Sequence, residues 1–405
     1  MVAWLGRAFV TLLSVAVVAA VGFGWYTYRT AADNVVRDDV IPAAPEQAPS
    51  ARDLPRTSQT ILLVGLDSRT DNQGNPLPRE VLDALNAGDA TGVQNTDTMM
   101  VVHIPADPEK KAFAVSLPRD SYVDIAGGFG EHKLNSAYVR GKNEEASRLQ
   151  GSGLDAAAID RESSTAGRKN LIATVQNLTG LTIDHYAEIN LYGFSELTKA
   201  VGGVPVCLNE PVHDTYSGAN FPAGEQVLQG VDALRFVRQR HGLPNGDLDR
   251  VRRQQAFMAG LTNQLFSSGT LTSPSRISSL VDALTKSVVL DQNWDLMSFA
   301  TQVATLTGDD IQFSTIPTGT INLSTPYDGS AVEVDPDQVR AYFQGLLNGP
   351  TASTQSPPTP PVEPGTPEAG YHTSTPDDRS VTVQKLAQEQ PDAQTITAAG
   401  IPCVN

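Results

Sequence analysis

Basic residues gather in one short stretch of a chain that is acidic overall. Six of the 29 lysines and arginines lie between Arg235 and Arg253, while the formal net charge is −16. Because like charges this close repel, such a cluster is costly unless an anion lies against it. Guanidinium groups bind phosphate oxygens in pairs, and several converging on a diphosphate stabilise the charge that develops when a phosphoryl–oxygen bond breaks. The alternative is a surface helix laced with aspartate–arginine pairs.

The spacing within this stretch lets the guanidinium groups converge. Residues 230–240 read as a helix that brings Arg238 and Arg240 out at its end. The next helix starts at Asp247 or Asp249. Positions three and four apart share one side of a helix. On this second helix those positions are Arg250, Arg253, Gln254 and Phe257.

Two acids stand at the ends of apolar runs. Asp67 closes the run 60–67, and Asp97 precedes the run 98–104. The ends of adjacent strands can lie side by side, and two carboxylates meeting there repel unless they share a proton or a cation. Mg²⁺ commonly binds one or two carboxylates plus substrate phosphates, so this pair with the arginines indicates phosphoryl chemistry. Taken alone, either acid could be a helix or turn cap.

A third apolar run supplies further cations and limits the alternatives. Arg119 leaves the run 111–120 toward the same edge, and Lys133 follows it. An arginine in this place is either a site residue or an edge residue with a buried stem. No phosphate-binding glycine loop, serine-hydrolase elbow or His/Cys metal spacing is present, which disfavours ATP hydrolysis and serine esterase chemistry. The sequence pI of about 4.7 argues against nucleic acid as a partner.

These residues must be positioned by a core in which short apolar runs alternate with helix-like stretches. The runs typical of buried strands are 60–67, 98–104, 111–120, 184–191, 204–209 and, late in the chain, 311–317. The expected helices are 78–87, 168–179, 194–203, 230–240, 247–268 and two more patterns within 276–307. Residues 148–164 read as a loop or lid. The alternation predicts an α/β domain, a three-layer α-β-α sandwich with a central sheet covered on both faces.

The N-terminal residues are typical of a membrane anchor. Residues 8–28 are apolar and uncharged, long enough as a helix to cross a hydrocarbon layer of about 30 Å. We therefore expect a short cytoplasmic tail and a transmembrane helix in 1–29, a linker in 30–58, and a large domain outside the cell. A cleaved signal peptide is the alternative.

The C-terminal part divides into a linker and a tail. Residues 346–378 are rich in Pro and Thr and cannot bury enough apolar surface to fold alone. The tail 379–405 could dock back through Cys403. Outside the cell, Cys403 and Cys207, the two cysteines of the chain, could form a disulfide. Two unpaired buried thiols are the alternative.

Several motifs together carry a family resemblance. The segments LLVGLDSR, NTDTMMVVHI, SLPRDSYV, KLNSAY and ALRFVRQRHGLPNGDLDRVRRQQAF resemble the LytR-CpsA-Psr family of bacterial cell-envelope proteins, in its actinobacterial form. The motifs run from about residue 59 to 268, and the architecture to about 345, so the resemblance implies a catalytic domain at 59–345 with a mixed central sheet. It also implies a phosphotransferase at the cell membrane. This enzyme would move a glycopolymer from a polyprenyl diphosphate carrier to a hydroxyl of peptidoglycan through a phosphodiester bond.

The resemblance also assigns roles to residues. Asp67 and Asp97 match the acids that bind magnesium, and the matches to residues that hold the diphosphate are Arg119, Arg238, Arg240, Arg250 and Gln254. Lys133 matches less closely. Many members carry an arginine where this chain has Asn95, and Arg69 could supply that contact. We therefore expect a catalytic set of Asp67, Asp97, Arg119, Arg238 and Arg240, and a substrate-binding set of Arg69, Lys133, Arg250, Arg253 and Gln254.

Other functions remain open at this point. A non-catalytic binder of lipid-linked glycans would need the arginines but not the carboxylates. A pyrophosphatase would act on the same carriers with water as acceptor. A membrane-bound transcription attenuator would need a cytoplasmic DNA-binding face, which a few residues before the span cannot supply. The sequence leaves open the polymer (arabinogalactan, teichoic or capsular) and the general base. Residues 257–306 could line a cleft for the lipid or simply be core.

Overall fold

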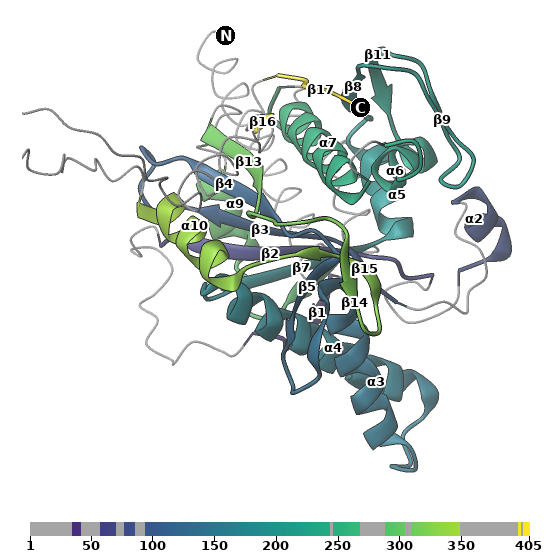
Figure 1. Ribbon diagram of the computed structural model, residues 1–405, viewed down its shortest axis with the longest axis vertical. Helices are drawn as coiled ribbons and strands as arrows, with labels where there is room; N and C mark the ends of the chain where they lie inside the picture. Colours follow the sequence, from purple (N-terminus) through teal and green to yellow (C-terminus); the bar gives the residue numbers. More distant parts are fainter. Residues whose placement is uncertain are drawn as a thin grey trace, which may run out of the picture.

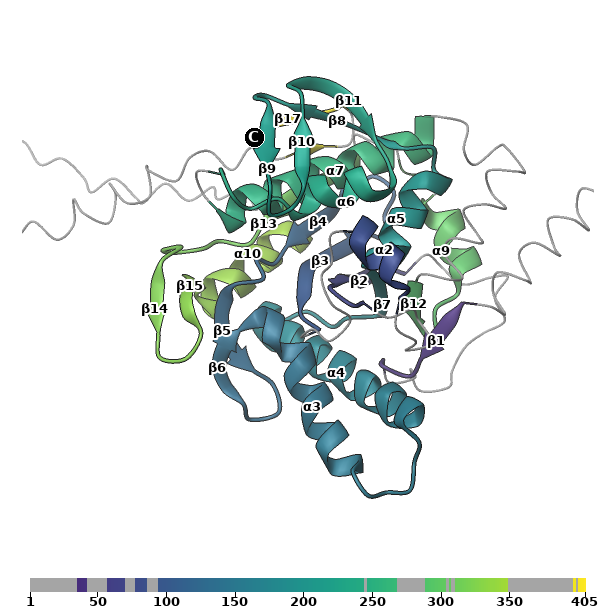
Figure 2. The same cartoon turned by 90° about the vertical axis from the view of Figure 1, so that its right-hand side faces the viewer.

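A mixed sheet of eight strands forms the centre of the molecule (Figures 1 and 2). The computed structural model describes residues 35–41, 57–69, 77–85, 94–243, 246–267, 288–303, 306, 310–348, 396–397 and 400–405. In spatial order the strands are β1 (Val36–Asp38), β12 (Val288–Asp291), β7 (His185–Asn190), β2 (Gln59–Leu66), β3 (Thr96–Ile104), β4 (Ala112–Ser116), β13 (Ile311–Thr315) and β16 (Ile396–Thr397). The pairs β1–β12, β2–β7 and β4–β13 are parallel, and the others are antiparallel.

Helices cover both faces of this sheet because side chains alternate along its strands. In β2, Leu62 and Val64 pack into one core with α3 (Ala137–Leu149), α4 (Ala156–Thr179) and α10 (Pro336–Asn348). The neighbouring Ile61 and Leu63 point to the other face, where α9 (Leu296–Val303) and α7 (Asp247–Ser267) lie. Successive strand residues face opposite sides, so both sets of β2 are apolar. The predicted three-layer arrangement is confirmed.

A second core lies above the central sheet in Figure 2. There α5 (Leu191–Ala200), α6 (Gly230–Arg238) and α7 pack with a three-stranded sheet of order β11 (Gly224–Leu228), β8 (Val204–Leu208) and β17 (Cys403–Val404). The run 204–209 was expected among the core strands and instead forms this separate sheet. Smaller elements complete the described fold. They are α2 (Arg79–Ala84), the 3₁₀ turn Leu134–Ser136, the hairpin β9 (Val212–Asp214)–β10 (Ala219–Phe221), and the sheet of β14 (Leu323–Thr325), β15 (Gly329–Glu333), β5 (Ser121–Ile125) and β6 (Gly130–Lys133).

The expected loop at 148–164 is wrong, because α4 already begins at Ala156. Asp155 caps this helix by accepting a hydrogen bond from the Ala158 backbone N–H at 2.7 Å. Small residues let α4 approach α3 closely: a Cβ added at Gly141 would lie 2.6 Å from Asn170, and one at Gly167 would lie 2.7 Å from the Tyr138 carbonyl. Within the segment read as a loop, Ser163 and Ser164 are buried on α4, whereas Gly151 and Gly153 lie in the turn between α3 and α4.

The N-terminal and late segments also differ from expectation. Residues 36–38 lie within the expected linker 30–58 but form β1 at the edge of the central sheet. Of the helical patterns expected in 276–307, residues 276–287 lie outside the described residues, 288–291 form β12, and 296–303 form α9. Most of the linker expected at 346–378 also lies outside them. The expected span 8–28 does too, and no helix among the described residues is long and apolar enough to cross a membrane.

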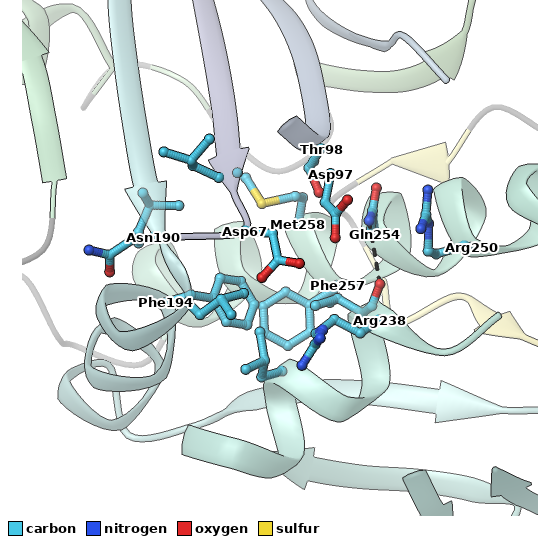
Figure 3. A pocket seen from close by; sticks show the side chains of 16 residues that line it. Asp67, Asp97, Thr98, Asn190, Phe194, Arg238, Arg250, Gln254, Phe257 and Met258 are labelled. Atoms are coloured by element: carbon cyan, nitrogen blue, oxygen red, sulfur yellow. Dashed lines mark hydrogen bonds between the residues drawn. The ribbon is translucent and has the colours of Figure 1, made fainter. Parts of the chain in front are cut away.

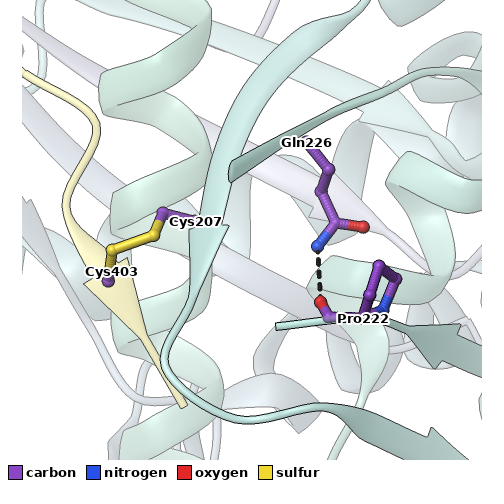
Figure 4. The surroundings of a disulfide bond; sticks show 4 residues. All are labelled: Cys207, Pro222, Gln226 and Cys403. Atoms are coloured by element: carbon purple, nitrogen blue, oxygen red, sulfur yellow. Dashed lines mark hydrogen bonds between the residues drawn. A yellow bond between two sulfur atoms is a disulfide. The ribbon is translucent and has the colours of Figure 1, made fainter. Parts of the chain in front are cut away.

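A disulfide joins the C-terminal segment to the second core (Figure 4). Cys403 bonds to Cys207, and β17 pairs in parallel with β8 at that point. The alternative of two free thiols is wrong. Farther back in the same segment, β16 pairs with β13 at the edge of the central sheet. Strands β16 and β17 thus each pair with a different sheet, and both contact α7.

Candidate active site

The two acids expected at strand ends lie together. Asp67 directly follows β2, and Asp97 is the second residue of β3. These strands are antiparallel neighbours, so the end of one lies beside the beginning of the other. The Asp67 backbone N–H donates to the Asn95 carbonyl at 3.0 Å, which fixes the two chain segments against each other. Both side chains line the same cavity, as Figure 3 shows.

This first cavity is lined by apolar side chains and by charged ones. Its volume is about 80 Å³. Helices α5, α6 and α7 supply the apolar wall, which consists of Leu191, Phe194, Leu234, Val237, Phe257 and Met258. The polar side chains are Asp67, Asp97, Thr98, Asn190, Arg238, Arg250 and Gln254. An apolar ligand chain with an anionic head fits this division of the lining.

The end of α6 and the start of α7 position the cations. Arg238 is in the last turn of α6 and donates to the Leu85 carbonyl at 3.2 Å. Arg250 is 3% exposed and donates to Asp247 at the start of α7. Gln254, one turn further, donates to the Val237 carbonyl at 3.4 Å and so ties α7 to α6. The predicted convergence of two helix ends on one point is thus present for Arg238, Arg250 and Gln254.

Charge and burial raise the pKa of Asp67. Burial is the larger cause, and the negative charge of Asp97 adds to it, while the charges of Arg238, Arg69 and Arg119 oppose the rise. One oxygen of this carboxylate, Oδ1, is buried without a hydrogen-bond partner among the described residues. A buried, unpartnered carboxylate oxygen beside a second carboxylate is a suitable ligand for a hard cation.

A second, polar cavity adjoins the first through Arg119. Its volume is about 280 Å³, and its lining includes Arg119, Lys133, Arg240, Asp120 and Asp247. Arg119 forms an ion pair with Asp97 of the first cavity. The cations gather around Asp120, at 3.2 Å from Arg240 and 3.6 Å from both Arg119 and Lys133. The structure therefore brings the predicted Arg119, Lys133 and Arg240 together, beside rather than inside the apolar cavity.

Two acids of this cavity were missed by the sequence interpretation. Asp120 directly follows Arg119 and is 8% exposed. A charged pair immediately after a buried strand was the available signal. Asp247 was read as the start of a helix, yet it is also buried and holds Arg250. Burial raises the pKa of Asp247, and the Arg250 charge opposes that rise.

Arg253 does not line either cavity, which corrects its expected place in the site. It is fully buried, its Nε donates to the Asn405 carbonyl, and its guanidinium lies 5.1 Å from the centre of the Phe236 ring. Although Arg253 is only three positions from Arg250, its side chain is covered by Phe236 of α6 and by the C-terminal segment and so does not reach the cavity. Arg69 lies near enough for its charge to lower the pKa of Asp67, but it lines neither cavity.

Comparisons with known proteins agree on one family. Residues 26–341 match the LytR_cpsA_psr family. The chain is 51% identical over 288 residues to the "Cell wall biosynthesis protein LcpA" of Corynebacterium glutamicum, covering 71% of this chain and 55% of that protein. It is 33% identical over 230 residues to the "Polyisoprenyl-teichoic acid--peptidoglycan teichoic acid transferase TagU" of Enterococcus faecalis, covering 56% of this chain and 65% of that protein. The matches thus span between about half and two thirds of these relatives.

Solved structures share the fold. TagV of B. subtilis matches with a TM-score of 0.52 at 22% identity, covering 73% of this chain and 99% of that one. The LytR-Csp2A-Psr enzyme from Actinomyces oris matches with a TM-score of 0.51 at 19% identity, covering 77% and 95%. At these identities the likeness concerns the fold alone.

Proposed function

Because the chain belongs to the LytR_cpsA_psr family, we propose that it is a transferase of cell wall assembly. It moves a glycopolymer from a polyprenyl diphosphate carrier onto peptidoglycan through a phosphodiester bond. The observation that supports this function is the lining of the first cavity, which combines an apolar wall with two carboxylates and two arginines. The enterococcal relative, which is named a polyisoprenyl-teichoic acid–peptidoglycan teichoic acid transferase, fits the same two substrates.

Each part of the cavity has a task in this reaction. The apolar wall from α5, α6 and α7 takes the first part of the polyprenyl chain. Arg238 and Arg250 of the first cavity hold the diphosphate. Arg119 and Arg240 of the adjoining cavity neutralise the charge on its outer oxygens. An acceptor hydroxyl then attacks the phosphorus that carries the glycan, and the lipid phosphate leaves. One carboxylate of the acidic pair accepts the hydroxyl proton.

Asp67 and Asp97 would hold a magnesium ion. The unpartnered Oδ1 of Asp67 and its nearness to Asp97 support this proposal. Among the described residues no cluster of three or more His, Cys, Asp or Glu could hold a metal. Two carboxylates fit Mg²⁺, because this ion usually completes its shell with water and substrate phosphates. When bound, it would supply positive charge against the diphosphate.

The proposed function also includes a location for the protein at the cell membrane. Residues 8–28 would form a single membrane helix, with the catalytic domain on the outer side of the cell membrane. There the enzyme meets both the lipid carrier and peptidoglycan. The disulfide between Cys207 and Cys403 supports an oxidising compartment outside the cytoplasm.

A reconstituted reaction tests this function. The full chain is incubated with a synthetic polyprenyl diphosphate glycan, nascent peptidoglycan and Mg²⁺, and the products are weighed by mass spectrometry. We expect a phosphodiester-linked glycan on peptidoglycan and free polyprenyl phosphate. Release of glycan phosphate into water would instead identify a pyrophosphatase, and donor retention without any product would identify a binder.

A variant of the acidic pair separates catalysis from binding. Asp97→Ala is expected to lower the transfer rate by at least about 100-fold, because one of the two carboxylates that would hold the magnesium ion beside the diphosphate is lost. Retention of the lipid-linked donor should persist, since the apolar wall and the arginines remain. Asp337→Ala, at an exposed position on α10, is the control and should transfer at the parent rate. Parent-level transfer by Asp97→Ala would contradict the proposal.

A further inference from the structure

A third cavity lies on the opposite side of the strand ends from the apolar cavity. Its volume is about 150 Å³, and its lining includes Leu66 and Asn190, which also line the apolar cavity. The apolar cavity is formed with α5, α6 and α7, whereas the third cavity is formed with α3 and α4. Figure 2 shows these two helix groups on opposite sides of β2 and β7. Asp67 therefore stands between two cavities, flanked by Leu66 and by Ser68 of the third cavity.

The lining of the third cavity suits a hydroxyl-rich ligand. Lys142 Nζ donates to Gln94 Oε1 at 2.6 Å, Asp160 Oδ1 at 2.7 Å and Ser164 Oγ at 3.0 Å. All four side chains line the cavity, and Arg161 lies exposed at its rim. The lining thus contains both hydrogen-bond donors and acceptors, and both cations and carboxylates.

The deeper wall of this cavity is also balanced in charge. Arg168 forms ion pairs with Glu188 at 2.8 Å and with Asp38 at 2.7 Å. Lys142 and Arg168 are thus each held by carboxylates of the cavity, so their charges are engaged within the protein rather than offered to a diphosphate. A saccharide, whose hydroxyls both donate and accept hydrogen bonds, matches the mixture. The many hydrogen-bonding side chains of this lining therefore distinguish it from the first cavity, where apolar residues of α5, α6 and α7 form one wall.

The geometry of phosphoryl transfer connects the two cavities. The attacking and leaving oxygens lie roughly in line on opposite sides of the phosphorus. In the proposed function the lipid phosphate leaves toward the apolar cavity, so the attacking oxygen approaches from the other side. We propose that the third cavity binds a saccharide unit of the acceptor and presents its hydroxyl to the donor. This inference rests on the proposed function and adds the acceptor subsite to it.

In this step one bond to phosphorus forms and one breaks. The acceptor oxygen forms a bond to the phosphorus that carries the glycan. The bond from this phosphorus to the bridging oxygen breaks, and the lipid phosphate leaves with the electron pair. In the overall balance the hydroxyl proton is taken up by the departing lipid phosphate.

Variants at the rim test the subsite kinetically. Arg161→Ala removes a charged donor, and Arg161→Trp also narrows the opening. With a peptidoglycan glycan acceptor, we expect the acceptor KM to rise about tenfold for Arg161→Ala, the usual effect of losing a charged hydrogen bond, and further for Arg161→Trp. The donor KM should stay unchanged. Lys169→Trp is the matched control, because Lys169 is exposed on the same helix and does not line the cavity. An unchanged acceptor KM in both Arg161 variants, or an equal rise in Lys169→Trp, would overturn the inference.

A binding measurement without donor distinguishes this inference from the proposed function. Saturation-transfer NMR is recorded on the full chain with a tetrasaccharide of alternating N-acetylglucosamine and N-acetylmuramic acid. We expect binding by the parent chain and by Lys169→Trp, and its loss in Arg161→Trp with an unchanged melting temperature. Absence of transfer together with Arg161-dependent binding would refute the proposed function and keep the saccharide site. Transfer together with binding that ignores Arg161 would refute the site alone.

Discussion

Two arginines three positions apart on α7 have different surroundings and therefore different expected roles. Both are buried, but Arg250 lines the apolar cavity, whereas Arg253 lies under the C-terminal segment. Arg250→Ala should lower the transfer rate about 100-fold, because a cation that faces the diphosphate is lost. Arg253→Met should keep the parent rate, since an apolar side chain of similar size often replaces a buried charge without loss. Steady-state transfer rates and melting curves check both, and an equal loss of activity in the two variants would contradict the assignment.

His103 links the stability of the central sheet to pH. Its ring is buried, stacks on Phe113 at 5.0 Å and contacts the Thr60 hydroxyl at 3.1 Å. Burial lowers the pKa of His103 below its ordinary 6.5, although Asp184 opposes this. The unfolded chain thus binds the proton more readily than the folded one. Its contribution to stability is complete above about pH 6.5 and is lost as the pH falls through the depressed pKa.

We therefore expect His103→Gln to lose less stability than the parent chain between about pH 7.5 and 5.5. Urea denaturation midpoints at both pH values measure the difference. His213→Gln, at an exposed position of β9, is the control and should keep the parent slope. If His103→Gln and the parent chain show equal slopes, the buried neutral imidazole is refuted.

At the scale of elements, close packing of α7 on β8 depends on one glycine. A Cβ added at Gly260 would lie 2.1 Å from the Pro205 carbonyl oxygen, and that oxygen belongs to backbone that cannot move aside. Gly260→Ala should therefore destabilise the fold by about 1–3 kcal/mol. Gly345→Ala on α10 is the matched control, because nothing lies within 4 Å of its added Cβ. There alanine should stabilise the helix by roughly 0.5–1 kcal/mol. Opposite signs in urea denaturation are expected, and equal effects would contradict the packing.

The elements that could be predicted from the sequence are those with strong apolar periodicity. The strands near 60–67 and 98–104 were predictable because both faces of each are buried and apolar. Helix α3 and the first turns of α4 were not, because small residues at their contact lower the apolar signal. Strand β1 was hidden for another reason, since three residues at a sheet edge carry little pattern. Separation of 204–208 into its own sheet depends on pairing between distant segments.

In the candidate site, too, some residues could be predicted from the sequence and others could not. Strand-end acids and helix-end arginines could be placed because their positions follow from local geometry. The two faces of the junction at Leu66 could not, because the third cavity needs residues from β1, α3 and α4 that are far apart in the chain. Arg253 was misplaced since helical spacing alone does not show which neighbour covers a side chain.

For the whole molecule, the disulfide between Cys207 and Cys403 closes a separation of 196 residues. Cross-links of this length restrict the unfolded chain strongly, and their loss typically costs about 2–5 kcal/mol. Cys403→Ser should therefore lower the free energy of unfolding by that amount, and the melting temperature should fall equally on reduction of the parent chain. The double variant Cys207→Ser, Cys403→Ser should not respond to reductant. A parent chain that melts at the same temperature after full thiol release would contradict this.

The order of synthesis has a consequence for the way the two sheets are finished. Strands β8 and β13 emerge from the ribosome or an export channel well before residues 396–404. Until those residues arrive, the backbone groups that later pair with β16 and β17 are exposed at two open edges. Exposed edges can recruit the same edge of another nascent chain. The newborn polypeptide is therefore most prone to aggregate just before β16 and β17 pair with these two edges.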